Sequence, residues 1–564
     1  MSDDNIPVVI GVGRITQRTG SDLDRALDPI QLMAEASRRA AADAVAGGAA
    51  SSSALLGSLG SVSTVMMLLE DRVPKGVPPF YRNPSLALAR QLGAPAKARC
   101  AMSYHGGHAA QMLVNELAEK LSVGEIKLGI VAGGECLDTF MKATKAGRVQ
   151  LPGGAAVRDA VGRQYASDAG AKKFVWGDDP NSPAPEVIGK VMRIASVHEA
   201  KHGLAAPATA YAIMDQALRC HLGRSIEDHL HHNAELFAGF SRVAAGAAAE
   251  HAWFPRARSA AELETVSPEN RAVTMPGYPK YMNSVMDVDQ AAAVMLATVG
   301  EARRLGVPES QWVYLHGTAD AMEEPSSLLS RPEMHRSHAL AAVGKELVAS
   351  SGVAMDKVEI FDIYSCFPVA VEIACRELGL GEKRDGEKLT LTGGLPYHGG
   401  PGNAYTLFGV VAMCEQLRKR PGAFGLVTAN GGYVTKHSAG IYSTTPYAAT
   451  HPGQPSWRRR DPEELQRRLQ AEAVEVPVAT VAEGRCRVES YTVEYGREGP
   501  TRAVVVGRLL AGPSAGQRFI ATSRETAAME LMAAKDCIGL EGSVATSGDR
   551  CTFAPDGVAG KSKL

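Results

Sequence analysis

The sequence is poor in the features that mark several classes of protein. Aromatic residues make up only 5% of it, and its Lys and Arg residues are scattered, which argues against a nucleic-acid-binding surface. Its nine cysteines are irregularly spaced and include no Cys-x-x-Cys pair, which argues against zinc ribbons and disulfide scaffolds and indicates a reducing compartment. No apolar run is long enough to span a membrane, and the first residues do not resemble a signal peptide.

The remaining composition is typical of a globular protein. The chain has 564 residues, of which 45% are hydrophobic, and a net charge of −1, so it is long enough for two or three domains. Its last three residues, Ser562-Lys563-Leu564, form a peroxisomal address. We therefore expect a peroxisome-type organelle if the source is eukaryotic, and the cytoplasm if it is bacterial.

One four-residue motif occurs twice, as Tyr104-His105-Gly106-Gly107 and as Tyr397-His398-Gly399-Gly400. Each copy leads into a helix-periodic apolar stripe and then into an apolar strand that ends in paired glycines. The stripes are Ala109, Leu113, Leu117 and Leu121 in the first copy, and Leu407, Val410, Cys414 and Leu417 in the second; the strands cover residues 127–134 and 424–432. The chain is therefore predicted to contain two copies of one structural unit.

Other segments divide the chain further. Residues from about 140 interrupt the alternation of strands and helices with long helical patterns over 208–222 and 226–244, which suggests an insertion that covers a site. Residues 286–305 are predicted to be helical again. The tail alternates polar and apolar residues on both sides of a turn at Arg497 to Pro500, which is typical of a β-hairpin.

We predict four parts from this pattern. They are an N-terminal half over 1–285 with a loop domain inserted at about 140–270, a C-terminal half over 286–450, a linker over 451–476, and a small β-barrel over 477–564. The Arg run in the linker, Arg458 to Arg460, is interpreted as a solvated face.

Several motifs resemble those of the thiolase superfamily, with the sterol-carrier-type thiolases as the nearest branch. They include Ala132-Gly133-Gly134-Glu135, Pro276-Gly277-Tyr278-Pro279-Lys280, Gly393-Gly394-Leu395-Pro396 and Gly399-Gly400-Pro401-Gly402. The resemblance covers about residues 5–450. It implies an α/β fold of two βαβαβαββ halves in αβαβα layers, with a loop domain that holds coenzyme A. The tail resembles the OB-type barrels that accompany some thiolase-like proteins.

The resemblance also locates four reactive positions, and all four are changed. Tyr104 stands where the family has its acylated cysteine, and Tyr364 replaces the residue that helps to hold the oxyanion-hole water. Gly400 stands at the usual histidine, with His398 two residues away, and Ala429 at the second cysteine. The family implies an acyltransferase, but without thiolate and base we expect ordinary thiolase activity to be lost. Cys100 lies too early to be the nucleophile and is expected to be a buried strand residue.

Further candidates lie in the insertion. Lys280 is the candidate phosphate contact for coenzyme A, together with Arg271. His229 and His232 have metal-ligand spacing on a predicted helix beside His231, but an exposed helix face is favoured and we expect no metal. Coenzyme A is expected as a substrate or ligand, and no other cofactor.

Three hypotheses stay open at this stage. The chain binds CoA or an acyl-CoA without thiolase chemistry, or it is a retro-aldol acyl-CoA lyase, or it is a non-enzymatic lipid-transfer or scaffold protein. In the lyase, Tyr104 and Tyr364 form an acid–base pair whose pKa values are lowered by backbone donors. The sequence allows a monomer or a homodimer.

Overall fold

The computed structural model describes residues 3–20, 22–48, 51–72, 79–149, 157–158, 164–165, 174, 176–177, 179, 181–190, 194–381, 385–453 and 456–557. The tripeptide Ser562 to Leu564 lies outside the described residues, as does most of the segment 150–180. Within the described residues, no helix has the length and apolar character needed to cross a membrane.

The first half of the chain folds as strands alternating with helices. Asp28 caps the first long helix by accepting a hydrogen bond from the Gln31 amide, and Pro29 occupies its first turn, as the sequence indicates. The elements are β1 (Pro7–Thr16), α1 (Pro29–Ala44), α2 (Ser52–Leu56), β2 (Ser61–Thr64), α3 (Pro84–Leu92), β3 (Arg99–Ser103), α4 (Ala109–Ser122), β4 (Leu128–Cys136), β9 (Asp289–Thr298) and α10 (Val299–Arg304).

The second half repeats this arrangement. Its elements are β10 (Val313–Met322), α11 (His338–Ser351), β11 (Val358–Asp362), α12 (Pro368–Glu377), α13 (Tyr405–Lys419), β12 (Phe424–Gly431), β13 (Lys436–Ser443) and α14 (Tyr447–Thr450). The strand order β1-β9-β4-β2 in the first half matches β10-β13-β12-β11 in the second, and the parallel and antiparallel pairings match as well. The predicted repeat is therefore confirmed.

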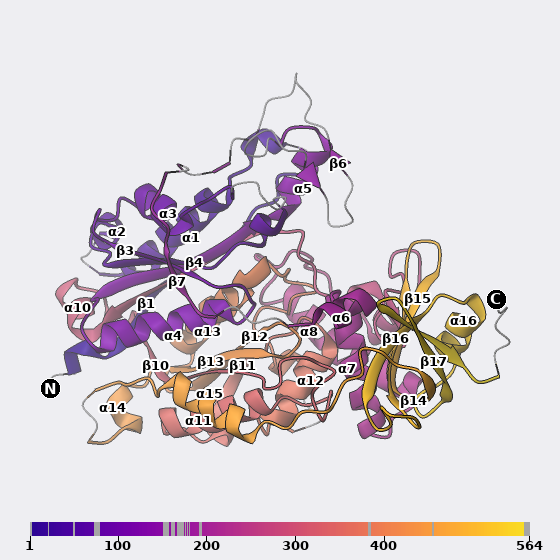
Figure 1. Cartoon of the computed structure of the whole chain (residues 1–564). Helices are drawn as coiled ribbons and strands as arrows, with labels where there is room; N and C mark the ends of the chain where they lie inside the picture. The colour runs from indigo at the N-terminus through magenta and orange to yellow at the C-terminus, as the bar shows by residue number, and fades with distance from the viewer. Residues whose placement is uncertain are drawn as a thin grey trace.

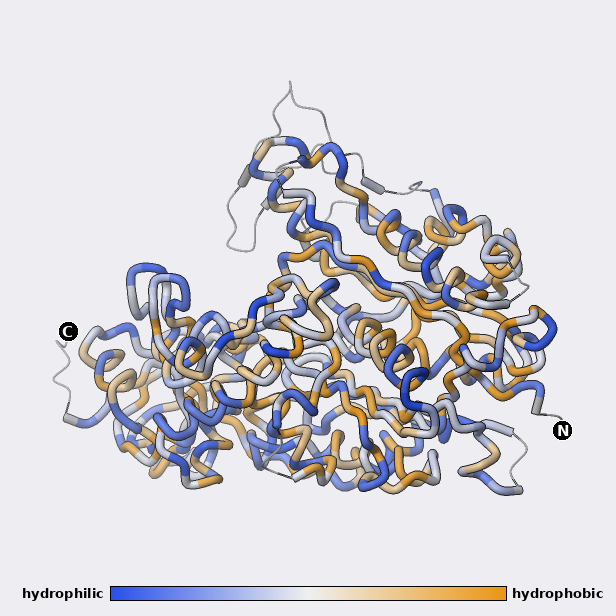
Figure 2. Tube along the Cα trace, turned by 180° about the vertical axis from the view of Figure 1, so that it is seen from behind, coloured by the Kyte–Doolittle hydropathy of each residue, from blue (hydrophilic) through white to orange (hydrophobic). Residues whose placement is uncertain are grey.

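The two sheets join where β1 pairs with β10, and helices α4 and α13 lie between them. Both helices are buried over most of their surface, which is the property of a helix enclosed by other layers. All eight predicted stripe residues are fully buried. Figure 2 shows the same distribution, with apolar segments in the central strands and hydrophilic ones in the outer loops. The layered α/β fold expected from the sequence is confirmed.

One prediction for this region is wrong over most of its length. Residues 286–305 are expected to be helical, but only α10 is, and β9 crosses the first sheet between β1 and β4. Every residue of β9 is buried, because both faces of the sheet are covered. An apolar run without alternation fits a buried strand as well as a buried helix. Because β9 completes the first sheet, the second half begins with β10.

The insertion between β4 and β9 contains the two long helices that the sequence predicts, α7 (Pro207–His221) and α8 (Ile226–Ala245). The shorter elements of the insertion are α5 (Leu137–Lys145), β5 (Val157–Arg158), β6 (Gln164–Tyr165), β7 (Glu186–Ile188), α6 (Val197–Glu199), α9 (Ala260–Glu264) and β8 (Thr274–Met275). Strand β7 leaves the insertion to pair with the outer edge of β3.

The tail forms a small closed β-barrel with its own apolar core. Its elements are β14 (Gly484–Tyr495), β15 (Pro500–Leu509), β16 (Arg518–Ser523), α16 (Thr526–Ala534), β17 (Glu541–Ser547) and β18 (Arg550–Pro555). The ring closes because β14 pairs with both β15 and β17, while β16 pairs with β18. The small all-β C-terminal domain expected from the sequence is confirmed.

The barrel is docked on the insertion, beside α6 and α7 (Figure 1). Strand β8 pairs with β14, and the buried hydroxyls of Ser490 and Thr492 donate to the carbonyl oxygens of Ile213 and Pro276 at 2.7 and 2.8 Å. Since these hydroxyls have no access to water, the contacts hold the barrel in one orientation.

The linker is also anchored. It contains α15 (Pro462–Glu472), and Arg459 forms ion pairs with Glu119 at 2.9 Å and with Asp320 at 2.7 Å. The interpretation of the Arg run as a solvated face is wrong for Arg459, whose side chain is 9% exposed. The guanidinium fastens the linker to both halves of the core.

Candidate functional site

A cavity of about 640 Å³ opens where the loops of both halves meet the insertion. Four loops form its floor: the segment between β3 and α4, the segment between β11 and α12, the segment before α13, and the turn between β12 and β13. The lining residues include Tyr104, His105, Gly107, Tyr211, Tyr364, Cys366, Phe367, Gly400, Asn403, Asn430 and Lys436. The two halves therefore build one shared site.

The first repeated motif forms one wall of the cavity. The Tyr104 amide donates to the Ile188 carbonyl at 2.6 Å, which ties the loop to β7. Gly106 has a φ of +143°, a conformation that other residues rarely adopt. Its N–H donates to Asn403 Oδ1 at 3.1 Å, so a side chain of the second half fixes this loop of the first half. Tyr104 is half-buried on the resulting surface.

Tyr364 faces Tyr104's loop from the second half. Its hydroxyl lies so close to Gly107 that a Cβ added there would come within 3.0 Å of it. The hydroxyl forms no hydrogen bond with the described residues, and the ring packs edge-on against Tyr405 with centroids 5.4 Å apart. Burial raises the pKa of Tyr364 above its usual value of 10. The expectation that backbone donors lower this pKa is therefore wrong, and the hydroxyl stays protonated at neutral pH.

Cys366 lies beside a polar network that the insertion completes. The Tyr211 hydroxyl donates to the Gly432 carbonyl at 2.9 Å and accepts from Asn430 Nδ2 at 2.9 Å. The same amide reaches the Cys366 sulfur at 3.9 Å. Burial raises the pKa of the Cys366 thiol to about 12, against the lowering effect of hydrogen bonds from Tyr211 and Asn430. This cysteine is a thiol at neutral pH.

His398, proposed from the second repeated motif, does not line the cavity. Its ring is fully buried against Phe408 and Tyr405, and Nδ1 contacts the Gly399 carbonyl at 3.1 Å. Burial lowers its pKa to about 3, so the imidazole is neutral. Among the neighbouring positions, Gly400 lines the cavity, whereas Ala429 is buried in β12 behind it.

The proposed phosphate contacts lie on the surface. The Lys280 amide donates to the Arg271 carbonyl at 2.9 Å, so the backbone brings these two residues together. Both side chains are exposed, and neither belongs to the cavity lining. Their assignment to coenzyme A stays a prediction. Cys100 is half-buried in β3, outside the cavity, and burial raises its pKa.

Sequence reasoning missed two residues of the site. Tyr211 stacks on Phe367 with ring centroids 4.4 Å apart, and Lys436 lines the cavity at the start of β13. Tyr211 belongs to a helix that was predicted to cover a site, so its segment was indicated but its role was not. Lys436 belongs to no motif, and only the turn that brings β13 back toward the cavity reveals it.

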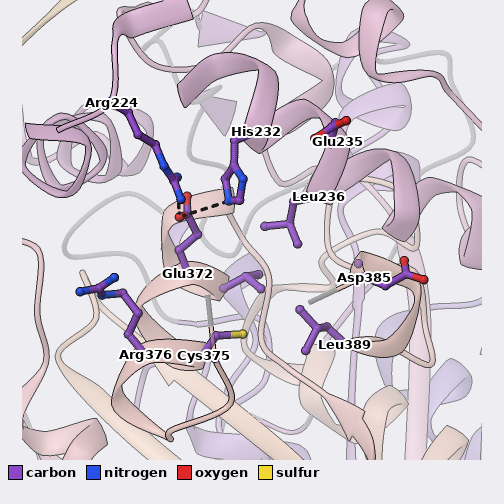
Figure 3. A pocket seen from close by; sticks show the side chains of 12 residues that line it. Arg224, His232, Glu235, Leu236, Glu372, Cys375, Arg376, Asp385 and Leu389 are labelled. Atoms are coloured by element: carbon purple, nitrogen blue, oxygen red, sulfur yellow. Dashed lines mark hydrogen bonds and ion pairs between the residues drawn. The ribbon is translucent and has the colours of Figure 1, made fainter. Parts of the chain in front are cut away.

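A second hollow, of about 520 Å³, lies between α8 and α12 (Figure 3). The Glu372 carboxylate forms its polar end, held by Arg224 Nη1 at 3.1 Å and His232 Nε2 at 3.4 Å. These charges compensate one another within the protein, so the hollow presents no surplus charge at this end.

Contrary to the prediction from the sequence, the histidines of α8 do not lie on one exposed face of the helix, because they differ in burial. His229 is buried and donates through Nε2 to Asp215 at 3.0 Å, because its Nδ1 accepts from Arg224 at 3.2 Å. Atoms of Asp215, His229 and Glu372 lie within 4.8 Å of one another, a metal-like grouping. The Arg224 guanidinium already supplies the cation for this cluster. His231 is exposed and pairs with Glu264 at 2.8 Å.

Comparison with known proteins supports the fold at two levels. Residues 464–549 match a family model described as the thiolase-like protein type 1 additional C-terminal domain. The whole chain is similar to the crystal structure of a monomeric SCP2-thiolase like protein type 1 from Mycobacterium smegmatis. The sequence identity is 29%, the TM-score is 0.76, and the match covers 98% of this chain and 100% of that one.

More distant structures share the fold of the core. The dimeric peroxisomal thiolase of Saccharomyces cerevisiae has 16% identity and a TM-score of 0.52, with 78% of this chain and 98% of that one covered. An Ltp2-ChsH2(DUF35) aldolase has 16% identity and a TM-score of 0.51, over the same shares of the two chains. A search among curated proteins found no match. The chain is therefore similar over its whole length to a thiolase-like protein of type 1, its core has the fold of the thiolases, and its tail matches the additional C-terminal domain of the type 1 proteins.

Proposed function

We propose that the protein binds an acyl-CoA thioester in the 640 Å³ cavity and does not carry out thiolase chemistry. The proposal rests on the protonation state of the cavity thiol. Cys366 is the only cysteine among the described residues that line the cavity, and its pKa is raised to about 12. A thiolate is the nucleophile that acyl transfer to cysteine needs. At pH 7 about one Cys366 in 10⁵ carries it.

The other thiolase positions support the same conclusion. By the family resemblance, Tyr104, Gly400 and Ala429 stand where thiolases have cysteine, histidine and cysteine. The nearest imidazole of that loop, His398, is buried behind the cavity wall. The cavity therefore keeps the place for a thioester, but its described lining has no activated thiol.

A titration tests this proposal. CoA, acetyl-CoA and hexanoyl-CoA are added to the full chain in a calorimeter, and thiolysis of acetoacetyl-CoA is followed in parallel. We expect saturable binding at one site and no thiolysis. Thiolysis that a Cys366→Ala variant abolishes, or the lack of any binding, would contradict the proposal.

A second candidate function is retro-aldol cleavage of a β-hydroxyacyl-CoA. The observation that favours it is that Tyr104 and Tyr364 line one cavity from opposite halves of the chain. Tyr364 keeps its proton, so it suits the role of the acid that protonates the enolate carbon. Tyr104, in its phenolate form, would accept the proton of the β-hydroxyl and become the neutral phenol. A structurally similar protein is described as an aldolase, and this chain carries a fused barrel domain beside the same core.

The lyase is tested by product release. A set of β-hydroxyacyl-CoAs with branched and linear chains is incubated with the protein, and free ketone or aldehyde is measured with acyl-CoA. A lyase should release the carbonyl compound and the acyl-CoA in equal amounts. Neither product should form with Tyr364→Phe or with Tyr104→Phe. Release that survives both substitutions would exclude the tyrosines.

We also propose that the chain is a monomer. Strand β7 pairs with the outer edge of β3, directly beside the Tyr104 loop, where thiolases use a dimer face. A covered strand edge cannot pair with a second copy. Light scattering at several concentrations should give the mass of one chain, 59.5 kDa, and twice that mass would contradict the proposal.

A further inference from the structure

Lys436 is a buried cation at the wall of the cavity. It is the first residue of β13, its side chain is 3% exposed, and it belongs to the cavity lining. Its Nζ donates to the His105 carbonyl at 3.1 Å, in the loop that also carries Tyr104. One hydrogen bond leaves two of the three ammonium protons without a protein acceptor among the described residues.

The charge of Lys436 is not compensated within the protein. It forms no ion pair with a described carboxylate, and burial alone lowers its pKa. Among the described residues that line the cavity there is no Asp or Glu, so Lys436 is the only strongly charged side chain there. A buried charge is costly unless it is paired. The site therefore favours a ligand that brings the missing negative charge.

The backbone before Lys436 is strained in a way that fixes its direction. Val434 has a φ of +53°, a rare conformation for a β-branched residue, and it is buried. The turn is held by the Thr435 hydroxyl, which donates to the Gly431 carbonyl at 3.1 Å, and by Arg331, which donates to the Tyr433 carbonyl at 2.9 Å. Strain of this kind persists where the surrounding structure enforces it, and it clusters at functional sites.

We propose that Lys436 binds an anionic oxygen on the acyl part of the thioester ligand. The inference rests on the proposed function, because it deepens the assignment of the same cavity. No other cation among the described lining residues competes for this oxygen, and no carboxylate repels it. The acyl group that fits the cavity therefore carries a negatively charged oxygen, or acquires one when it reacts.

Two sources of that oxygen share this chemistry. The first is a carboxylate at the far end of the acyl chain. The second is the thioester oxygen itself: when the C–C bond of a β-hydroxyacyl thioester breaks, its electron pair moves through the α-carbon to this oxygen and forms an enolate. The hydroxyl proton goes to the base, the β-carbon leaves as a carbonyl compound, and the α-carbon later takes up a proton. An ammonium group beside the enolate oxygen would stabilise it.

The experiment uses matched ligands and matched variants. Hexanoyl-CoA and adipoyl-CoA have the same chain length and differ by one terminal carboxylate, and succinyl-CoA and butyryl-CoA form a shorter pair. Their affinities are measured by calorimetry with the wild type and with Lys436→Met, which keeps the unbranched shape and most of the length of the side chain but not its charge. Lys190→Met is the charge control, because Lys190 is exposed, pairs with Glu463 at 2.8 Å and lies outside the cavity.

A second readout distinguishes the two sources. Each protein is incubated with hexanoyl-CoA in D₂O, and the exchange of its α-protons is followed by NMR. This exchange requires the enolate but no terminal carboxylate. Thermal unfolding of Lys436→Met shows whether the variant is folded, and CoA alone reports whether it still binds the common part of the ligands.

We expect one of two results. In the first, the dicarboxylic acyl-CoA binds more tightly than its neutral partner by roughly tenfold or more, and this difference is lost in Lys436→Met but kept in Lys190→Met. That result identifies the terminal carboxylate as the source of the anionic oxygen. In the second, the α-protons of hexanoyl-CoA exchange with the wild type and with Lys190→Met, but not with Lys436→Met. That result identifies the enolate oxygen as the source. If CoA binds and Lys436→Met changes neither readout, this inference fails and the proposed function stands. If no CoA compound binds, both fail.

Discussion

Replacing Tyr364 by phenylalanine separates catalysis from folding at this site. The Tyr364 hydroxyl forms no hydrogen bond with the described residues, so its removal leaves no buried donor or acceptor without a partner. The free energy of unfolding should therefore change by less than about 1 kcal/mol. If the hydroxyl is the acid of a retro-aldol reaction, kcat should fall by about 10²–10⁴.

The matched control is Tyr211→Phe. The Tyr211 hydroxyl makes two hydrogen bonds, to Gly432 and from Asn430, so its removal should lower the free energy of unfolding by about 1–3 kcal/mol. Urea unfolding of both variants and steady-state cleavage of a β-hydroxyacyl-CoA are measured side by side. If Tyr364→Phe is destabilised as much as Tyr211→Phe, the hydroxyl is structural and the account of Tyr364 is refuted.

Substitutions at Gly107, His398 and Arg518 test three other parts of the structure. In Gly107→Ala the new methyl group would lie within 3.0 Å of the Tyr364 hydroxyl and of the Asn430 carbonyl. Acyl-CoA affinity should therefore fall at least tenfold in calorimetry, and an unchanged affinity would contradict this. Burial depresses the pKa of His398 to about 3, so the stability that the neutral imidazole contributes is present above pH 6.5 and is lost as the pH falls toward 3. Between pH 7 and 5, the free energy of unfolding measured in urea should therefore fall by about 2 kcal/mol less in His398→Leu than in the wild type. Equal losses in the two proteins would contradict this. Arg518→Met removes the hydrogen bonds that the guanidinium donates to the carbonyls of Leu329 and Arg331, and an ion pair with Glu489 at 2.7 Å. Limited proteolysis should therefore release the barrel faster from this variant than from the control Arg485→Met, whose guanidinium is exposed.

The repeat was predictable because it is written in local patterns. The stripes that begin at Ala109 and Leu407 recur with a helical period, and each is followed by an apolar strand and glycines. A helix enclosed between two sheets must be apolar on nearly every side, and such a run is visible in any sequence. The topology then follows from two copies of one unit that bury their faces against each other.

The errors arise where tertiary burial decides the outcome. The alanine-rich run in β9 has high helix propensity, but the sheet buries it on both faces and it becomes a strand. Arg459 stands in a charged run, yet Glu119 and Asp320 meet it from distant parts of the chain. Pairings across more than a hundred residues leave no local pattern in the sequence.

The candidate site shows the same division. Tyr104, Tyr364 and Gly400 were found because each follows a motif at a strand end or glycine turn, and all three line the cavity. Tyr211 and Lys436 were missed because each reaches the site through packing between segments that lie far apart in sequence. His398 was misplaced, since its neighbour Gly399 turns the backbone with a φ of +97° and the ring points into the core.

We expect the cavity to hold an acyl-CoA without forming an acyl-enzyme. The most direct measurement combines calorimetric titration of hexanoyl-CoA with intact-mass spectrometry of the same sample after incubation. We expect saturable binding of one ligand per chain and an unchanged protein mass, because the Cys366 thiol keeps its proton. A mass increase equal to the acyl group, located on Cys366, or the absence of binding, would contradict it.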